Sequence, residues 1–508
     1  MKRSESASTF GLDFTTSQTR VRRSSLLVKV CVTSAASLGA NVAWRKFMFF
    51  RNNRSHVSSK NVRRGGGGDE RKASGVAFMW RALGHRNYRL FFSGQSVSLI
   101  GTWMTRIATS WLVYRLTGSA LLLGVVGFAG QIPSFILAPF AGVLVDRWNR
   151  HRLLVATQVL AMLQSLALAI LAFTDLINVH YIIWLSVFQG LINAFDMPVR
   201  QAFVVEMIER REDLPNAIAL NSSMVNATRL LGPSIGGVII AAVGEGWCFM
   251  IDAISYIAVI ASLLAMKVTP RMTEQLREVN MLRQLREGFA YAARFAPIRN
   301  VLLLLALVSL VGMPYTVLMP VFADGVLHGG PNTLGMLMAA SGVGALIGAL
   351  FLAARKSVLG LGTLIPLTAA AFGVGLIAFS FSGVLWLSLA LMVVTGLGFM
   401  VQMAASNTVL QTIVDEDKRG RVMSFYTMAF MGTAPFGSLL AGSVADRIGA
   451  PHTLMFGGIG CIAGALWFAL SLPALRRDVR PIYERIGILP EMAAGIHTTS
   501  ELSVPPET

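Results

Sequence analysis

Long apolar runs recur along the chain from Leu90 to Leu472, with short polar segments between them. Each run has roughly 20 residues, enough for a helix rising about 1.5 Å per residue to cross about 30 Å of hydrocarbon. Most runs lack the polar stripe that marks a helix of a soluble bundle. The pattern therefore predicts an all-α polytopic membrane protein with twelve transmembrane helices. We expect them at residues 90–116, 121–145, 152–175, 180–198, 216–242, 247–267, 299–323, 332–354, 360–381, 384–406, 421–444 and 450–472.

Lysine and arginine are concentrated in alternate loops between these runs. Loops on one side carry Arg147, Arg150, Arg152, Arg200, Arg210, Arg211, Arg355, Lys356, Lys418, Arg419, Arg421, Arg476, Arg477 and Arg480, together with the cations between Lys267 and Arg299. On the other side, Arg447 is the clearest cation. Because cationic loops are retained in the cytoplasm, we expect a multi-pass protein of the inner (cytoplasmic) membrane with both termini cytoplasmic.

The longest loop between the runs divides the chain into two similar parts. We expect an N-terminal six-helix half at residues 80–267, a cytoplasmic linker with an amphipathic helix at 268–298, a C-terminal six-helix half at 299–472, and a cytoplasmic tail at 473–508. An internal repeat supports this division, because laying residues 201–253 on 406–458 pairs Gly232 with Gly437 and Gly237 with Gly442. A duplicated six-span unit is typical of transporters whose binding site lies between the two halves.

The first 79 residues differ from the rest, being polar, rich in serine and arginine, and therefore predicted to be disordered. Eighteen Lys and Arg against four acidic residues in the first 89 positions supply most of the net charge of +18, so this charge does not indicate nucleic-acid binding. The segment resembles an organellar transit peptide, but an upstream start codon in a bacterial reading frame would give the same composition, with Met79 beginning the mature protein. A regulatory tail is a further alternative.

The loop between the second and third expected spans contains Gly142, Asp146, Arg147, Arg150 and Arg152. This spacing resembles the loop signature of the major facilitator superfamily, which implies the major facilitator fold. A glycine allows close helix packing, an aspartate can face the positive end of a neighbouring helix dipole, and arginines bind headgroups. The resemblance implies a conformational latch, and the alternative is an ordinary cationic loop.

A second motif lies in the fifth expected span, where Gly232, Pro233, Gly236 and Gly237 resemble the antiporter motif of the same superfamily. Small residues and a proline allow close packing and a bend. Because importers usually lack this motif, the resemblance favours export, although simple helix packing would also explain it.

Several shorter phrases resemble the branch of the superfamily that contains the enterobactin exporter and macrolide-efflux proteins. They are Asn87-Tyr88-Arg89-Leu90-Phe91, Phe195-Asp196-Met197-Pro198, Asp213-Leu214-Pro215-Asn216 and Arg419-Gly420-Arg421. The resemblance extends from about Ala82 to Leu472. One departure is Ser186, which stands where many proton antiporters of the superfamily carry an arginine, so the usual proton relay is in doubt.

Ionisable residues inside the apolar runs are candidates for coupling, since burying a charge in a membrane costs several kcal/mol unless it is paired or faces water. The candidates are Arg106, Arg229 and Asp252, with Asp196 and Arg200 at the end of the fourth run. We expect Arg229 and Asp252 to approach each other, either as a structural ion pair or as a proton-coupling or substrate-binding pair.

The superfamily resemblance implies that the first, fourth, seventh and tenth spans surround a central pathway. Candidate substrate-binding residues on these spans are Trp103, Arg106, Gln189, Asn193, Tyr315, Met319, Gln402 and Asn407. Aromatic residues and methionine with few polar groups suit a bulky amphipathic organic compound. Ordinary helix packing is the alternative for each of them.

Motifs of ATP hydrolysis, metal binding and nucleophilic catalysis are absent, and Cys31, Cys248 and Cys461 are isolated, so we expect no enzyme, metal or cofactor. The leading hypothesis is a monomeric secondary exporter in the lipid bilayer, which moves a siderophore, macrolide or other drug-like molecule in exchange for protons by alternating access and binds no nucleic acid. Alternatives are uptake or facilitated diffusion by the same fold, or a transport-inactive membrane sensor or scaffold.

Overall fold

The computed structural model describes residues 80–267, 281–355, 357–486 and 488, and over these residues every regular element is helical. The predicted all-α class is therefore confirmed. The predictions for residues 1–79, for part of the linker and for residues 489–508 fall outside the described residues.

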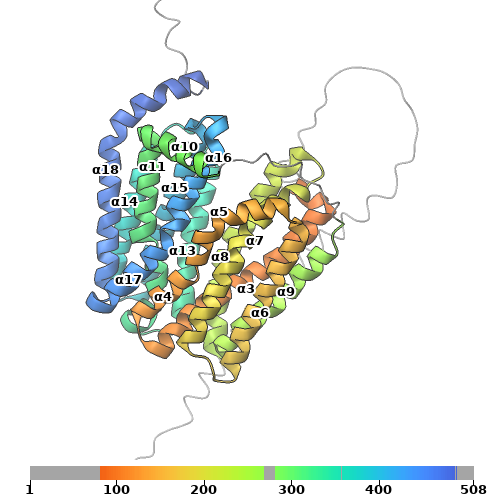
Figure 1. The fold of residues 1–508 in the computed structure, drawn as a ribbon. Coiled ribbons are helices and arrows are strands. Elements are labelled where there is room, and N and C mark those ends of the chain that lie inside the picture. Colours follow the sequence, from red (N-terminus) through yellow and green to blue (C-terminus); the bar gives the residue numbers. More distant parts are fainter. Residues whose placement is uncertain (1–79, 268–280, 356, 487, 489–508) are drawn as a thin grey trace, which may run out of the picture. The chain divides into compact units, whose positions relative to one another are not determined.

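The N-terminal six-helix half begins with a short 3₁₀ turn and continues through seven α-helices (Figure 1). The elements are η1 (Arg81–Gly84), α3 (Arg86–Thr117), α4 (Ala120–Ala129), α5 (Ile132–Arg147), α6 (Arg150–Phe173), α7 (Val179–Glu206), η2 (Arg211–Asp213), α8 (Leu214–Val243) and α9 (Glu245–Leu264). The break between α4 and α5 falls just before Pro133, which lacks a backbone N–H and so favours the first turn of a new helix.

The C-terminal half contains three π-helical turns within its spans, a geometry that is often found at functional sites. Its elements are α10 (Met281–Arg294), α11 (Ala296–Leu307), η3 (Val308–Gly312), α12 (Tyr315–Val321), η4 (Phe322–Val326), α13 (Pro331–Ala353), α14 (Leu361–Ser380), α15 (Leu385–Ile413), α16 (Glu416–Thr427), η5 (Met428–Gly432), α17 (Ala434–Ile448) and α18 (Ala450–Arg485). Pro314 and Pro435 follow η3 and η5 closely and interrupt the regular hydrogen bonding there.

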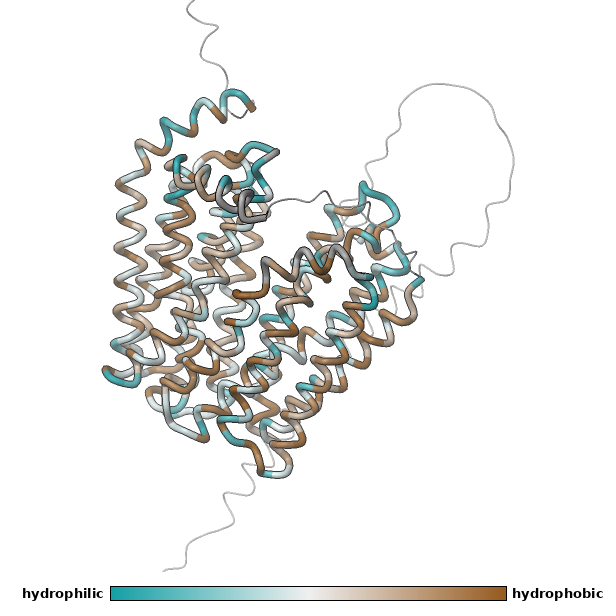
Figure 2. The backbone as a smooth tube through the Cα atoms, in the orientation of Figure 1, coloured by the Kyte–Doolittle hydropathy of each residue, from teal (hydrophilic) through white to brown (hydrophobic). Residues whose placement is uncertain are grey.

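Eleven segments in the described part of the chain are long and apolar enough to cross a membrane. The remaining predicted span, the first one at residues 90–116, corresponds to α3, whose 32 residues would extend about 48 Å at the rise of an α-helix. Four arginines make α3 more polar than the others. Figure 2 shows apolar residues along the lengths of the helices and polar residues at their ends, as expected for helices that span a bilayer.

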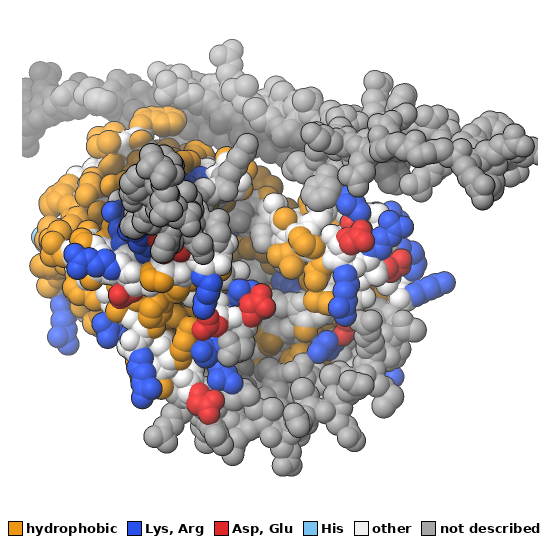
Figure 3. Space-filling model, turned by 90° about the horizontal axis from the view of Figure 1, so that it is seen from above, with side chains coloured by type: hydrophobic (Ala, Val, Ile, Leu, Met, Phe, Trp, Pro, Cys, Tyr) orange, Lys and Arg blue, Asp and Glu red, His pale blue; other side chains and the backbone are white. Residues whose placement is uncertain are grey.

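The packing follows two groups of six spans. In the N-terminal half α3 packs on α8 and α9, and α6 packs on α7 and α9; in the C-terminal half α15 packs on α13 and α14, and α18 on α14. The ends of α10 and α16 share the arginine-rich side, where Lys and Arg side chains gather over both halves (Figure 3). The two halves meet mainly through α8 with α13 and through α4 with α17.

Two glycine contacts join the halves on the side opposite the arginine-rich loops. A methyl group added at Gly237 of α8 would come within 2.7 Å of the carbonyl oxygen of Pro331, beside Gly335 of α13. A methyl group added at Gly442 of α17 would lie 2.8 Å from the Cα atom of Gly124 in α4. Because the internal repeat pairs Gly237 with Gly442, these are equivalent contacts, and they bring the two halves together at this side.

Candidate transport site

Two arginines and a tryptophan meet between α3 and α8. The Cζ atom of Arg106 lies 4.9 Å from the centroid of the Trp103 ring, and the Cζ atom of Arg229 lies 5.3 Å from it. Arg229 and Gly232 are three residues apart on one face of α8, and Gly232 packs directly against the Cβ atom of Trp103. The close helix contact made by this glycine therefore carries Arg229 to the same tryptophan.

This group faces the C-terminal half. The side chain of Arg106 is exposed although it lies near the middle of the long helix α3. Arg229 of α8 is half-buried, and α8 packs on α13 while α12 packs on α3. The hydroxyl of Tyr315 in α12 lies 2.7 Å from the hydroxyl of Ser341 in α13. Predicted substrate-binding residues from the first and seventh spans are thus neighbours across the two halves.

The expected approach of Arg229 to Asp252 is wrong. The carboxylate oxygen Oδ2 of Asp252 accepts hydrogen bonds from the hydroxyls of Thr105 and Ser165, each at 2.8 Å. Its other oxygen, Oδ1, has no hydrogen-bond partner within the described residues, and the side chain is 1% exposed. The rotation of α8, fixed by its glycines against α3, turns Arg229 toward Trp103 instead.

Asp252 therefore lies between helices of one half, and no cationic partner for it occurs in the residues that the structure describes. A methyl group at Gly101 of α3 would come within 2.6 Å of Oδ1, so the glycine provides the space that this oxygen occupies. Thr105, which donates to Oδ2, directly precedes Arg106 in α3. The carboxyl group is thus linked by one hydroxyl to the helix segment that carries the exposed arginine.

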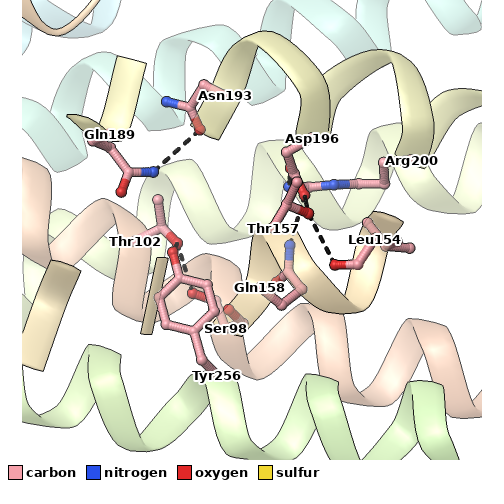
Figure 4. Close-up of polar contacts among 10 residues, drawn as sticks. All are labelled: Ser98, Thr102, Leu154, Thr157, Gln158, Gln189, Asn193, Asp196, Arg200 and Tyr256. Atoms are coloured by element: carbon pink, nitrogen blue, oxygen red, sulfur yellow. Dashed lines mark hydrogen bonds and ion pairs between the residues drawn. The ribbon is translucent and has the colours of Figure 1, made fainter. Parts of the chain in front are cut away.

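The other coupling candidates form a second polar cluster (Figure 4). Asp196 of α7 pairs with Arg200 one turn later and accepts hydrogen bonds from Thr157 at 3.0 Å and Gln158 at 2.6 Å. Asp196 is buried, at 3% exposed, with these partners around it. The charge of Asp196 is therefore balanced by Arg200, in contrast to that of Asp252.

The remaining predicted binding residues divide by accessibility. Gln189 and Asn193 are half-buried and share a hydrogen bond of 3.2 Å (Figure 4). Met319 and Gln402 are both 0% exposed, so neither faces open space in this conformation. Asn407 is half-buried and accepts a hydrogen bond from the side chain of Gln411.

The predicted latch is described only in part, because the side chains of Gly142, Asp146 and Arg147 fall outside the described residues. Arg150 forms an ion pair of 2.8 Å with Glu206, the last residue of α7. The other predicted latch residue, Arg152, has an exposed side chain at the start of α6.

The antiporter-type motif makes two different helix contacts. Gly236 packs on α3, where an added methyl group would lie 2.8 Å from the Cγ2 atom of Ile107. Gly237 faces α13 in the other half, and the carbonyl of Pro233 lies against Gly335 there. One short motif therefore sets both the packing within a half and the contact between halves.

Two polar clusters on the arginine-rich side were not predicted. Asp213 at the start of α8 lies 3.0 Å from Nε2 of His85 and 3.1 Å from Nε of Arg81. His85 and Arg81 are four residues apart before α3, and this spacing was the signal that could have indicated a common acidic partner.

The second unpredicted cluster is centred on Asp415, between α15 and α16. Its carboxylate contacts Lys418 at 3.4 Å and Arg485 at the end of α18 at 3.3 Å. Desolvation raises the pKa of Asp415, but the hydrogen bonds and charges of these two cations outweigh it and lower the pKa below its usual value. The end of α18 is thereby fixed to the loop before α16.

No group of three or more metal-ligating side chains occurs in the described ranges. Cys248 and Cys461 are free and buried, as expected for isolated thiols.

The fold and this arrangement define the class: a multi-pass membrane transporter with two six-helix halves and polar groups between them. A family model described as "Transmembrane secretion effector" matches residues 77–486, and the chain belongs to this family of the major facilitator superfamily. The predicted superfamily and fold are thus confirmed. The family members and the structural neighbours are transporters and not enzymes.

Curated relatives match the chain over nearly their whole length. The staphyloferrin A transporter of Staphylococcus aureus is 27% identical, with 75% of this chain and 95% of the relative covered. Macrolide efflux protein A of Streptococcus pyogenes is 25% identical (75% and 96% covered), and the multidrug efflux pump Tap of Mycolicibacterium fortuitum is 28% identical (75% and 92% covered).

Solved structures support the same fold at lower identity. A bacterial homolog of the human lysosomal transporter Spinster superposes with a TM-score of 0.59 at 14% identity, with 78% of this chain and 98% of that one covered. A bacterial homologue of the iron transporter ferroportin gives a TM-score of 0.58 at 15% identity, with 77% and 98% covered.

Proposed function

We propose that this protein exports a small amphipathic organic compound from the cytoplasm in exchange for protons. The efflux and secretion transporters among its relatives support export. The arginine-rich side is then the cytoplasmic side of the inner membrane, both termini are cytoplasmic, and the transporter acts as a monomer. The substrate class includes siderophores, macrolides and other drug-like molecules.

The environment of the Asp252 carboxyl group is the observation that supports proton coupling. It is fully buried, has no cationic partner among the described residues, and leaves one oxygen without a hydrogen bond. An ionised carboxylate in such a place costs several kcal/mol, and protonation removes that cost. A protonated carboxyl would be stable here, and ionisation would favour a conformation in which water or a cation reaches Asp252.

Proton movement is coupled to substrate through α3. Ionised Asp252 accepts from Thr105, whereas the protonated form can donate, so the hydrogen bond changes when the proton moves. Thr105 is next to Arg106 in the exposed group between the halves. Substrate and proton therefore each favour a different arrangement of the same helix, which is the requirement for exchange.

Alternating access requires the two glycine contacts to separate. Gly237 with Gly335 and Gly442 with Gly124 hold the halves together on the side opposite the arginine-rich loops. Under the proposed orientation this is the external side, so the described conformation is closed outward. The group of Trp103, Arg106 and Arg229 would then receive substrate from the cytoplasm.

The test uses inside-out vesicles acidified inside, with staphyloferrin A and a macrolide as labelled probes. We expect at least one probe to accumulate, a protonophore to abolish the accumulation, and Asp252→Asn to remove the dependence on the pH gradient. Glu245→Gln is the control, since Glu245 is a buried acid with a cationic partner, Arg115, at 2.9 Å. Unchanged pH dependence in Asp252→Asn would exclude Asp252 as the coupling group.

The alternatives give different results in the same assay. Uptake or facilitated diffusion would move probe into right-side-out vesicles or down its gradient without proton dependence. A sensor or scaffold would give no flux in either preparation while still binding a partner.

A further inference from the structure

We infer that the exported compound carries a carboxylate or a similar anionic group, which binds to Arg106 and Arg229 between the two halves. This inference rests on the proposed transport function and names its substrate class. The observation behind it is two neighbouring guanidinium groups inside the membrane-spanning region that have no acidic partner among the described residues.

Within the described part of the chain, no acidic side chain forms an ion pair with either arginine. On α9, Asp252 bonds to Thr105 and Ser165 and Glu245 pairs with Arg115, while Asp196 of α7 pairs with Arg200. Arginine retains its proton in proteins, so the two guanidinium groups repel each other. A charge inside the membrane costs several kcal/mol unless it is paired or faces water.

The contacts that the protein does provide are too weak to balance that cost. Each guanidinium lies over or beside the ring of Trp103, and a cation–π contact contributes only about 0.5–2 kcal/mol. Arg106 remains exposed. Two positive charges beside one tryptophan, one exposed and the other half-buried, form a site that an anion would complete.

The side chains are also arranged for a carboxylate in particular. A guanidinium donates two parallel N–H bonds to a carboxylate, and packing against Trp103 restricts the orientation of both guanidinium groups before the ligand arrives. The neighbouring hydroxyl of Tyr315, bonded to Ser341, offers a further polar contact from the other half. An anion bound here would contact both halves, so its binding would depend on how they are positioned.

A cationic compound would be rejected at this site. It would meet two like charges in a medium of low dielectric constant, where repulsion is stronger than in water. The site therefore selects against cations as well as for anions, and a neutral compound of the same shape would accept only weaker hydrogen bonds from the arginines than a carboxylate does.

The experiment compares three probes that share one aromatic body: 1-naphthylacetate, 1-naphthylacetamide and 2-(1-naphthyl)ethylamine. Binding to the purified full-length protein in nanodiscs is measured by titration calorimetry. We expect the carboxylate to bind at least tenfold more tightly than the neutral amide, and the amine to bind more weakly still. Arg106→Gln and Arg229→Gln should each weaken carboxylate binding about tenfold and leave amide binding unchanged.

Arg480→Gln is the matched control, because Arg480 is a half-exposed arginine paired with Glu484 near the end of α18. Arg106→Lys and Arg229→Lys retain the charge and guard against misfolding of the Gln variants; they should bind the carboxylate more tightly than the Gln variants do. Equal affinities for the three probes, preference for the amine, no carboxylate binding in the millimolar range, or carboxylate binding that is insensitive to both Gln substitutions would overturn the inference.

Failure of this inference is distinguishable from failure of the proposed function. If carboxylate binding depends on both arginines but no proton-driven flux is found, the substrate class stands and the exchange mechanism fails. If proton-driven flux of the amide or amine is found and neither Gln substitution reduces it, the exchange stands and the anionic substrate class is wrong.

Discussion

The contact of Gly442 with Gly124 provides a direct test of how the two halves separate. Replacing Gly442 with alanine adds a methyl group 2.7 Å from the carbonyl oxygen of Ala120 and 2.8 Å from the Cα atom of Gly124. Carbon atoms in ordinary contact are about 3.5–4.0 Å apart, so α4 and α17 must move apart by about 0.7–1.2 Å. The neighbouring atoms are backbone, which cannot rotate out of the way.

The substitution should shift the conformational equilibrium rather than unfold the protein. Overpacking typically costs about 1–3 kcal/mol, and here the cost applies only to the conformation in which α4 and α17 touch. Since about 1.4 kcal/mol corresponds to a factor of ten, the outward-closed state should lose about 5- to 150-fold in relative population. Gly237→Ala should act in the same direction, because its methyl group would meet the carbonyl of Pro331 at 2.7 Å.

The assay measures how fast a thiol-reactive, membrane-impermeant maleimide labels a single cysteine from outside. Ser438→Cys, in a chain whose native cysteines are replaced by alanine, reports on the contact, since Ser438 is buried in α17 beside Gly124. We expect faster labelling in Gly442→Ala and unchanged labelling in Gly362→Ala, whose methyl group would meet only one atom, at 3.5 Å. Equal labelling rates in the two variants would refute the reasoning.

Three further predictions concern the arginine-rich side. Asp415→Asn should break the contact with Arg485, loosen the end of α18 and raise trypsin cleavage there about twofold, a small effect because the pair is exposed. Because the pKa of Asp415 is lowered, its carboxylate is ionised at every pH above the ordinary pKa of an aspartate. The contact should therefore be as strong at pH 5 as at pH 7. Asp213→Asn should weaken the contact with His85 and lower stability by about 1–3 kcal/mol, measured by thermal unfolding. Asp146→Asn should slow turnover with little change in probe affinity, and unchanged turnover would exclude the latch.

Hydropathy predicted the spans because crossing a bilayer demands about 20 apolar residues whatever the neighbours are. It placed the ends of α7 and α18 less well. Prediction ended the fourth span at Pro198, yet α7 continues to Glu206, since the ion pair of Asp196 with Arg200 and two hydrogen bonds from α6 hold the helix on both sides of the proline. Such tertiary support is not visible in a local pattern.

The sequence identified the residues of the candidate site by their type, but it did not show which of them contact each other. Arg106, Arg229 and Asp252 were found because charges in apolar runs are unusual, but the partner of Arg229 depends on the rotation of α8. That rotation follows from Gly232, which shares a face with Arg229 and packs on α3. The three-residue spacing between Arg229 and Gly232 would therefore have indicated that Arg229 faces α3 and does not pair with Asp252.

The π-helical turn η3 has a practical consequence for mapping the seventh span. A π turn accommodates one extra residue, and one residue corresponds to a rotation of about 100° in an α-helix. A helical wheel drawn continuously from Ala296 therefore assigns residues after Gly312 to the wrong sector, and Met319, expected on the pathway, is enclosed by protein. Cysteine-scanning libraries for this span should restart their angular register at Tyr315.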